Sequence, residues 1–182
     1  MTKILPDVET VATLINLELI RDCLARYCRG MDRRDMEMLR SVYWPEARDQ
    51  HGSFRGSPAE FIAWIEPVLD GIELTQHFLG QNLIRIEDNQ AFAETYYNAY
   101  HRLSSTDGRM EVYLWGRYHD KFECRGGIWK IVNRLVVCDG YRKHDTVSDD
   151  WQSFPFGPVP ENSIGSGIAD PSRNFWNFVS SG

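Results

Sequence analysis

Four long extended runs, which lie between residues 74 and 140, constrain the fold of this chain more than any other feature. They are LTQHFLGQNLIRIE, AFAETYYNAYHRL, EVYLWGRYHDKFEC and IWKIVNRLVVCDG, and only the short segments DNQ, SSTDGRM and RGG separate them. Extended runs that are joined by such tight turns pair as antiparallel neighbours. The second half of the chain is therefore predicted to form an antiparallel meander of four long strands.

Helical patterns come before this meander. Over Val8–Arg29 an apolar stripe is predicted at helical spacing, and Gly30 is predicted to end that helix. The stripe consists of Ile20, Leu24 and Tyr27, widened upstream by Val11, Leu14, Ile15 and Leu17. Asp32 is predicted to begin a second helix, which ends by Pro45 because a residue before proline avoids the helical region. If Asp32 is only the N-cap of this helix, it needs no further role.

A hairpin and a third helix follow. Arg48–Gly56 is predicted to form a short strand pair with Gly52 at its bend. The segment SPAEFIAWIEPVL is predicted to be a helix in which Ser57 is the N-cap, Pro58 is the first residue and Glu60 completes a capping box.

Helices first and strands second predict an α+β domain, in which N-terminal helices pack on one face of a strongly curved antiparallel sheet. Such a sheet would wrap around the helices into a cone and leave an apolar pocket. This domain is predicted to span residues 1–142. Residues 143–182 are expected to pack as a tail on the domain, across the pocket mouth, or on a neighbouring subunit, because aromatic residues stud them: Trp151, Phe154, Phe156, Phe175, Trp176 and Phe178.

Composition argues against several classes of protein. The net charge of −6, without any run of Lys or Arg, argues against nucleic-acid binding. No window approaches the roughly 20 apolar residues of a membrane span, and the N-terminus lacks the apolar core of a secretion signal. The four cysteines show no CxxC spacing and are expected to be free thiols in a reducing cytoplasm: Cys23, Cys28, Cys124 and Cys138.

Cofactor motifs are absent from the sequence. It contains no GxGxxG, P-loop, GxSxG, HExxH or EF-hand pattern, so no cofactor is expected. The five histidines leave a metal site open, although no two of them lie at helical i, i+4 spacing.

Polar residues on otherwise apolar elements are the candidates for chemistry. Strand alternation places Thr95, Tyr97, Ala99 and His101 on one face of the second long strand, and Leu114, Gly116 and Tyr118 on one face of the third. The predicted catalytic set is Asp32, His77, Tyr27, His101 and Arg134. The predicted pocket lining is Trp44, Tyr97, Ala99, Leu114, Gly116 and Tyr118. Asp49, His51, His119 and His144 are interpreted as loop or surface residues.

A carboxylate that binds one nitrogen of an imidazole leaves the other nitrogen free as a base. Asp32 and His77 could form such a pair, with Tyr27, Arg134 or His101 stabilising a developing oxyanion. Each residue also has a structural interpretation. His77 could be a satisfied strand histidine, Tyr27 a core tyrosine, His101 an exposed strand end, and Arg134 a partner in a structural ion pair.

Three stretches carry a resemblance to a known family: IRDCLARYCRGMDRRDMEMLRSVYWPEA, TQHFLGQNLIRIEDNQAFAETYYNAYHR and GRYHDKFECRGGIWKIVNRLVV. Together they resemble the SnoaL-like family of the nuclear transport factor 2-like superfamily. The resemblance implies that superfamily's cystatin-like α+β barrel. It also implies assembly into dimers or trimers.

The family includes scytalone dehydratases, bile-acid 7α-dehydratases and hexachlorocyclohexane dehydrochlorinases, which are cofactor-free lyases with an Asp–His pair. The resemblance implies that Asp32 and His77 form this pair here. It also matches three further positions to functional residues of these enzymes: Tyr27, His101 and Arg134. The sequence departs from the pattern at Met31 and near His51, where the scytalone enzymes carry water-holding tyrosines, and at Ala99, where the bile-acid enzymes carry an aspartate.

The resemblance and the residues together predict a cofactor-independent lyase, of a dehydratase or dehydrohalogenase kind, that acts on a small apolar cyclic substrate. Three alternatives remain open at this point. One is an isomerase of the ketosteroid kind or a cyclase. The others are a protein that only binds hydrophobic ligands and a small subunit of a larger enzyme.

Overall fold

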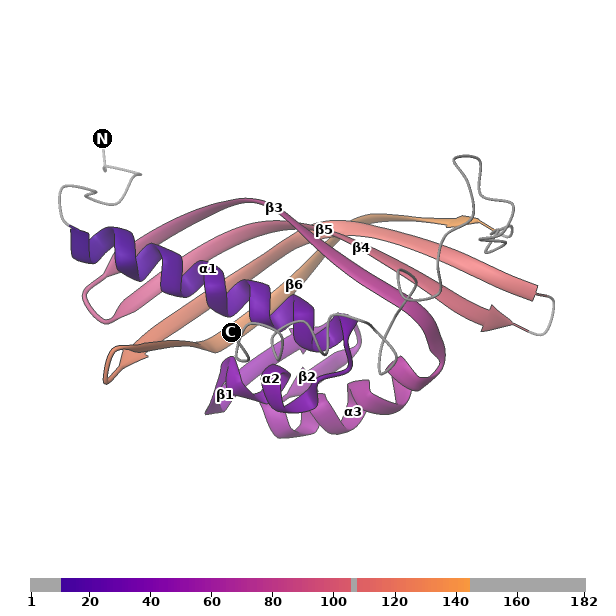
Figure 1. The fold of residues 1–182 in the computed structure, drawn as a ribbon, viewed down its shortest axis with the longest axis horizontal. Coiled ribbons are helices and arrows are strands. Elements are labelled where there is room, and N and C mark those ends of the chain that lie inside the picture. Colours follow the sequence, from indigo (N-terminus) through magenta and orange to yellow (C-terminus); the bar gives the residue numbers. More distant parts are fainter. Residues whose placement is uncertain (1–10, 106–107, 145–182) are drawn as a thin grey trace, which may run out of the picture.

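A computed structural model describes residues 11–105 and 108–144 of the chain (Figure 1). The helices are α1 (Val11–Asp32), α2 (Met36–Ser41) and α3 (Pro58–Asp70). The strands are β1 (Tyr43–His51), β2 (Phe54–Gly56), β3 (Ile72–Glu87), β4 (Gln90–Ser105), β5 (Gly108–Arg125) and β6 (Ile128–His144). Nearly all of the predicted aromatic tail lies outside the described residues.

The strands form one curved, open sheet in the order β2-β1-β6-β5-β4-β3. The predicted meander of four long strands is confirmed as β3 to β6, each antiparallel to the next. One pairing was not predicted, because β1 runs parallel to β6 and makes the sheet mixed. Figure 1 shows the sheet arching over α1, with α2, α3, β1 and β2 gathered beneath its middle part. This is the predicted α+β class with helices on the concave face.

The joint between α1 and α2 differs from the prediction. Gly30 does not end the first helix, which continues to Asp32, and Asp35 caps α2 by accepting a hydrogen bond from the Met38 backbone N–H at 2.9 Å. Gly30 is needed for close packing instead, since a Cβ there would lie 3.0 Å from the backbone nitrogen of Leu39. Asp32 is therefore released from capping.

The hairpin and the third helix match the sequence prediction. β1 and β2 pair antiparallel, and Gly52 sits between them with φ of 60°. Ser57 and Glu60 form the predicted capping box of α3, with Pro58 in the first turn. These local signals are reliable because each depends only on residues that are near in sequence.

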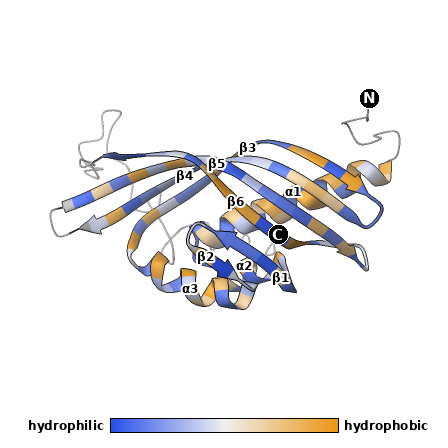
Figure 2. Ribbon diagram, turned by 180° about the vertical axis from the view of Figure 1, so that it is seen from behind, coloured by the Kyte–Doolittle hydropathy of each residue, from blue (hydrophilic) through white to orange (hydrophobic). Residues whose placement is uncertain are grey.

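The core lies between α1 and the concave face of the sheet. The predicted stripe of Ile20, Leu24 and Tyr27 is at most 1% exposed. Upstream, Leu17 is buried as predicted, but the prediction was wrong for Val11, Leu14 and Ile15, which are exposed in the first turns of α1, at one end of the sheet (Figure 1). Figure 2 shows polar and apolar residues alternating along the long strands, as expected when one face of a sheet is covered.

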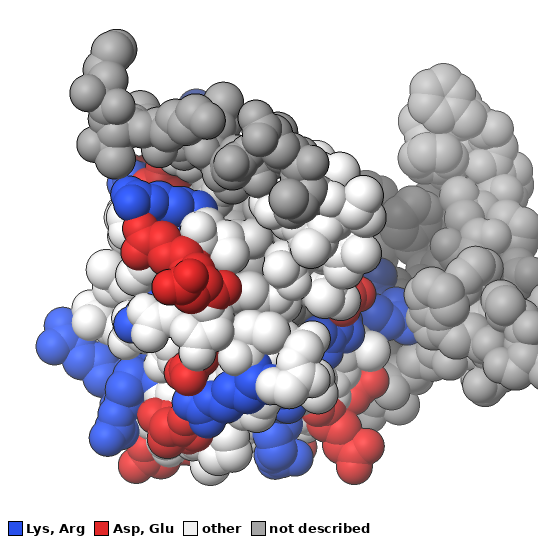
Figure 3. Space-filling view, turned by 90° about the vertical axis from the view of Figure 1, so that its left-hand side faces the viewer, with Lys and Arg blue, Asp and Glu red and all other residues white. Residues whose placement is uncertain are grey.

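Charges of both signs share the surface. Figure 3 shows Lys and Arg side chains interspersed with Asp and Glu at the end of the molecule where α1 begins. This mixture differs from the single-sign patch that nucleic-acid-binding proteins present. Within the described ranges, no helix combines the length and the apolar character that a membrane crossing requires.

Replacement of Gly30 by alanine tests the close packing of α1 against α2. Alanine favours a helix, but its methyl group would push against the Leu39 backbone, so Gly30→Ala should lower the free energy of unfolding by about 1–3 kcal/mol. Gly71→Ala is a matched control, because a Cβ there makes only ordinary contact at 3.5 Å. Urea unfolding of both variants measures the difference, and an equally stable Gly30→Ala variant would contradict this account.

Candidate functional site

The C-terminal end of α1 meets β3 through one carboxylate. Asp32 Oδ1 lies 2.6 Å from His77 Nδ1, and Asp32 Oδ2 accepts a hydrogen bond from the His77 backbone N–H at 2.9 Å. Both side chains are nearly buried, at 9% and 4% exposure. Two hydrogen bonds to one residue fix the position of the carboxylate and orient the imidazole. His77 Nε2 makes no hydrogen bond to the described part of the chain, so the predicted pairing is observed and leaves this nitrogen available.

Asp32 occupies an unfavourable position for a carboxylate. It is the last residue of α1, and the C-terminal end of a helix carries a partial negative charge that repels an anion. The two hydrogen bonds from His77 offset that repulsion. A residue that breaks a local preference while remaining buried and bonded marks a functional position more often than a structural one.

A second histidine lies next to the pair. The rings of His77 and His101 meet edge to face, with centroids 5.6 Å apart. Thr75 Oγ1 lies 3.0 Å from His101 Nδ1, which again leaves Nε2 without a partner among the described residues. Burial, with a smaller contribution from the neighbouring His77, lowers the pKa of His101 to about 4. His101 is therefore a neutral imidazole at physiological pH, and it is not the exposed strand end that the sequence left open.

Arg134 is held in the core by an ion pair. Its Nε and Nη2 donate to the two oxygens of Asp120, both at 2.7 Å, and neither side chain is exposed. The guanidinium stacks between the rings of Tyr27 and Tyr118, at 3.9 and 4.3 Å from their centroids. The predicted salt-bridge alternative for Arg134 is thus observed. Burial raises the pKa of Tyr27 well above its usual value, so its hydroxyl keeps its proton.

A further polar group on β1 was misplaced by the sequence interpretation. Asp49 is 1% exposed, not a surface residue, and it accepts a hydrogen bond from the Tyr43 hydroxyl at 2.5 Å. The side chain of His51 is 22% exposed, and its Nδ1 lies 3.5 Å from the Tyr27 hydroxyl. The signal was present in the sequence, because the alternation of β1 puts both on the face of the buried Ala47.

The same alternation could have found Asp120. It lies on the face of β5 that carries Gly116 and Tyr118, four and two residues upstream, and that face was followed only as far as Tyr118. The other two predicted surface histidines, His119 and His144, do face outward.

The predicted pocket lining divides into residues that lie near the site and one that does not. Tyr97 stacks on Tyr118, and Ala99 pairs across the sheet with both His77 and Leu114. Trp44 lies elsewhere, because its ring contacts Arg125 and Lys130 near the β5–β6 turn, and its Nε1 donates to the Glu123 carbonyl. Trp44 falls on the opposite face of β1 from its neighbour Tyr43, which faces the core.

Gly116, which the sequence predicted to line the pocket, lies where two strands approach closely. A Cβ there would lie 1.9 Å from the Val137 carbonyl oxygen, at a bulge between β5 and β6. Its small size permits two backbones to approach.

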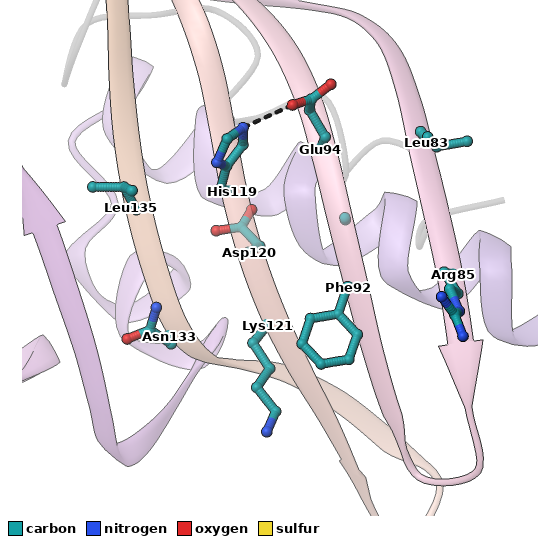
Figure 4. Close-up of a pocket in the computed structure, with 10 residues that line it drawn as sticks. Leu83, Arg85, Phe92, Glu94, His119, Asp120, Lys121, Asn133 and Leu135 are labelled. Carbon is teal, nitrogen blue, oxygen red and sulfur yellow. Dashed lines mark hydrogen bonds and ion pairs between the residues drawn. The ribbon is translucent and has the colours of Figure 1, made fainter. Parts of the chain in front are cut away.

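A hollow of about 390 Å³ borders the Asp32–His77 pair between α1 and β3, lined also by Cys28, Leu79 and Arg29. Two other hollows open on the outer face of the sheet. Figure 4 shows one of them, with its side chains on the strands and the helices behind, and with His119 bound to Glu94. Neither outer hollow includes a predicted catalytic residue. The described residues hold no group of three or more His, Cys, Asp or Glu that could bind a metal ion.

Comparison with known proteins identifies the fold and the family. The model of the SnoaL-like domain family matches residues 12–135, which is most of the chain. The chain belongs to the SnoaL-like family. This membership confirms the resemblance seen in the sequence. No curated protein sequence matches the chain significantly.

Solved structures share the fold at low sequence identity, which shows the fold alone. A hexachlorocyclohexane dehydrochlorinase, LinA-type3 from Novosphingobium barchaimii LL02, is 16% identical with a TM-score of 0.67, over 74% of this chain and 94% of that chain. A candidate scytalone dehydratase from Novosphingobium aromaticivorans is 16% identical with a TM-score of 0.65, over 84% and 97%. The Kfla4162 protein from Kribbella flavida is 16% identical with a TM-score of 0.65, over 72% and 95%.

Removal of one partner from the buried ion pair should destabilise the fold strongly. Asp120→Asn leaves the Arg134 guanidinium buried without a counter-charge and should lower the free energy of unfolding by about 3–5 kcal/mol. Asp139→Asn is the matched control, since Asp139 and Arg117 form a similar two-bond pair between the same strands, but in solvent. Denaturant unfolding should show little change for the control. Similar losses in both variants would contradict the assigned role of burial.

The lowered pKa of His101 predicts a pH-dependent contribution to stability. The pKa of His101 is about 4 in the folded chain, below the ordinary value near ~6.5. Between about pH 4 and pH 6.5, His101 is therefore protonated in the unfolded chain but neutral in the folded chain. The stability advantage of the wild type over His101→Gln should therefore shrink as pH falls from about 6.5, by up to about 1.4 kcal/mol per pH unit. Urea unfolding at about pH 7 and about pH 5 measures it, and a constant difference would contradict the shift.

Proposed function

We propose that this protein is a cofactor-independent lyase of the dehydratase kind, with His77 as the general base and Asp32 as the residue that orients it. The supporting observation is the geometry of the pair. Asp32 binds Nδ1 of His77 at 2.6 Å, so the ring presents Nε2, the basic nitrogen, away from the carboxylate. Asp32 also stabilises the imidazolium that forms when Nε2 takes up a proton.

The proposed step begins with a proton on a carbon next to a carbonyl, or on the carbon beside the one that carries the leaving group. His77 Nε2 removes this proton, and the C–H electron pair becomes the new C=C bond. The bond to the leaving group breaks, and that group departs with its electron pair. In a dehydration the hydroxide takes up a proton and leaves as water, so the reaction needs neither an oxidant nor a reductant. General base catalysis of this kind contributes about 10²–10⁴ in rate.

The neighbouring groups have distinct proposed roles. His101 lies edge to face with His77 and could hold the leaving group by a hydrogen bond, while the His77 imidazolium returns the proton to it. Tyr27 and Arg134 are at most 1% exposed and lie behind the pocket surface, so they act on the residues in front of them rather than on substrate. This differs from the direct role in oxyanion binding that the sequence suggested for both.

The proposed substrate is a small, apolar and cyclic molecule. Apolar groups border the site, since Leu79 lines the hollow beside Asp32 and His77 and Leu114 pairs across the sheet with Ala99, and such walls exclude water and strengthen the electrostatic interactions inside. The hexachlorocyclohexane dehydrochlorinase among the similar structures is named for a cyclic apolar substrate, which agrees with this proposal.

Hydrogen–deuterium exchange tests the base without knowledge of the natural substrate. A cyclic ketone incubated with the protein in D₂O should gain deuterium next to its carbonyl group, because the proposed base removes that proton reversibly. His77→Gln and Asp32→Asn should each slow the protein-dependent exchange by about 10²–10⁴. Mass spectrometry measures the label.

His119→Gln is the matched control, since His119 also contacts a carboxylate, that of Glu94, but on the outer face of the sheet. Its exchange rate should equal that of the wild type. If His77→Gln retained the wild-type rate, the base would be assigned wrongly, and a protein that only binds ligands would become the better account.

A further inference from the structure

Thr75 contacts the second histidine of the candidate site. It lies on β3 directly across from His101 on β4, two residues before His77, and so it shares the strand face that carries His77. Thr75 is 3% exposed. Its hydroxyl makes one hydrogen bond among the described residues, which joins Oγ1 to His101 Nδ1 at 3.0 Å. The proposed reaction gives this hydroxyl no role so far.

The Thr75 hydroxyl determines which nitrogen of His101 carries the proton. The ring is neutral and has one N–H, because burial lowers its pKa to about 4. If Nδ1 carried this proton, it would donate to Thr75 Oγ1, and the hydroxyl hydrogen of Thr75 would be buried without an acceptor among the described residues. If Nδ1 is unprotonated, the hydroxyl donates to it. Since buried polar groups are nearly always hydrogen-bonded, the proton belongs on Nε2.

Asp32 imposes the opposite arrangement on His77. An ionised carboxylate can only accept hydrogen bonds, so the proton of a neutral His77 ring lies on Nδ1 and its Nε2 is unprotonated. The rings of His77 and His101 are direct neighbours, with centroids 5.6 Å apart. One imidazole of the pair then offers a lone pair at Nε2, and the other offers an N–H.

We propose that Thr75 is a positioning residue, which holds the proton of His101 on Nε2 and so makes this ring a hydrogen-bond donor beside the base His77. Without the hydroxyl, His101 would present a second lone pair part of the time, and a lone pair repels the electron pair of a departing group. The inference rests on the proposed function for the use of this N–H, which is to hold the leaving group. The place of the proton depends on Thr75 and His101 alone.

Side-chain ¹⁵N NMR tests the place of the proton on the protein alone. At neutral pH, His101 should carry its proton on Nε2. Thr75→Val keeps the shape of the side chain but lacks the hydroxyl, and it should lower the ratio of the Nε2–H to the Nδ1–H tautomer by about 5-fold, the contribution of one ordinary hydrogen bond. Thr75→Ser restores a hydroxyl and should restore the ratio. A wild-type ring with its proton on Nδ1, or an unchanged ratio in folded Thr75→Val, would overturn the assignment.

Thr95→Val is the matched control. Thr95 lies on the neighbouring strand β4 and has no exposed surface, and its hydroxyl makes no hydrogen bond within the described residues. The same substitution there should leave the tautomer ratio of His101 at the wild-type value. An equal shift in both variants would show that the loss of any buried hydroxyl perturbs the site, and it would overturn the specific role of Thr75.

Thr75→Asp tests the use of the N–H. A carboxylate there should accept a hydrogen bond from Nδ1 of His101, as Asp32 does for His77, and so reverse the tautomer. The probe is the β-hydroxy derivative of cyclohexanone, which loses water to form cyclohexenone, a product that ultraviolet absorbance detects. The reversed tautomer should lower kcat for this dehydration by about 10- to 100-fold, the effect of one hydrogen bond to a charged group. Thr75→Val should lower kcat less, in proportion to its share of the wrong tautomer.

Deuterium exchange into cyclohexanone separates this role from that of the base. Exchange needs removal of a proton but no leaving group, so Thr75→Val and Thr75→Asp should exchange close to the wild-type rate, whereas His77→Gln should lose exchange and dehydration together. If the two Thr75 variants slowed both reactions equally, the substitutions would act on the base, and the role of Thr75 would be overturned. Wild-type exchange in His77→Gln would instead overturn the proposed base and leave the tautomer of His101 as assigned.

Discussion

The hydrogen bond between Asp32 and His77 is the interaction on which the rest of this structure depends. It joins the last residue of α1 to the edge strand β3, and it places a carboxylate where the helix itself would repel one. Gly30 permits the geometry because it lets α1 run on for two residues against Leu39, which carries Asp32 to the strand. The same bond selects the free nitrogen of His77. One contact thus accounts for the helix end, the strand position and the proposed base.

Behind this pair lies a rigid polar layer that the core shields from solvent. Arg134 is fixed by Asp120 and by two aromatic rings, and it holds its positive charge next to Tyr27. Buried ion pairs contribute little net stability, but removal of one partner is strongly destabilising, so such a pair positions its neighbours firmly. Tyr27, whose ring stacks on this guanidinium, lies with its hydroxyl 3.5 Å from His51 Nδ1, so the layer extends from β6 through α1 to β1.

Local signals in the sequence predicted much of this fold. The capping box of Ser57 and Glu60, the glycine bend at Gly52 and the turns that join β3 to β4 and β5 to β6 each depend on a few adjacent residues, and each was correct. The boundary at Asp32 failed, because the sequence offers two acidic residues for one cap. Only the packing of Gly30 against Leu39 shows that the helix continues and that Asp35 is the cap. The parallel pairing of β1 with β6 is likewise a contact between distant segments, and no local pattern encodes it.

In the candidate site, too, contacts between residues that are distant in sequence were the hardest to predict. The pairing of Asp32 with His77 was anticipated through the family resemblance, since two residues so far apart in sequence carry no local sign of their contact. Asp49, His51 and Asp120 were missed although strand alternation marks their faces, because the charge of the aspartates and the loop position of the histidine favoured a surface assignment. Trp44 was misplaced for the opposite reason. An aromatic residue on a strand suggested the pocket, whereas its ring covers charged residues on the outer side.

The protonation of His77 tests the central claim most directly. Side-chain ¹⁵N NMR at neutral pH should show the proton of His77 on Nδ1, toward Asp32, with Nε2 unprotonated, and the Asp32→Asn variant should lose this preference. A His77 ring in the wild type that carries its proton on Nε2 would leave no free base in the site and would contradict the account.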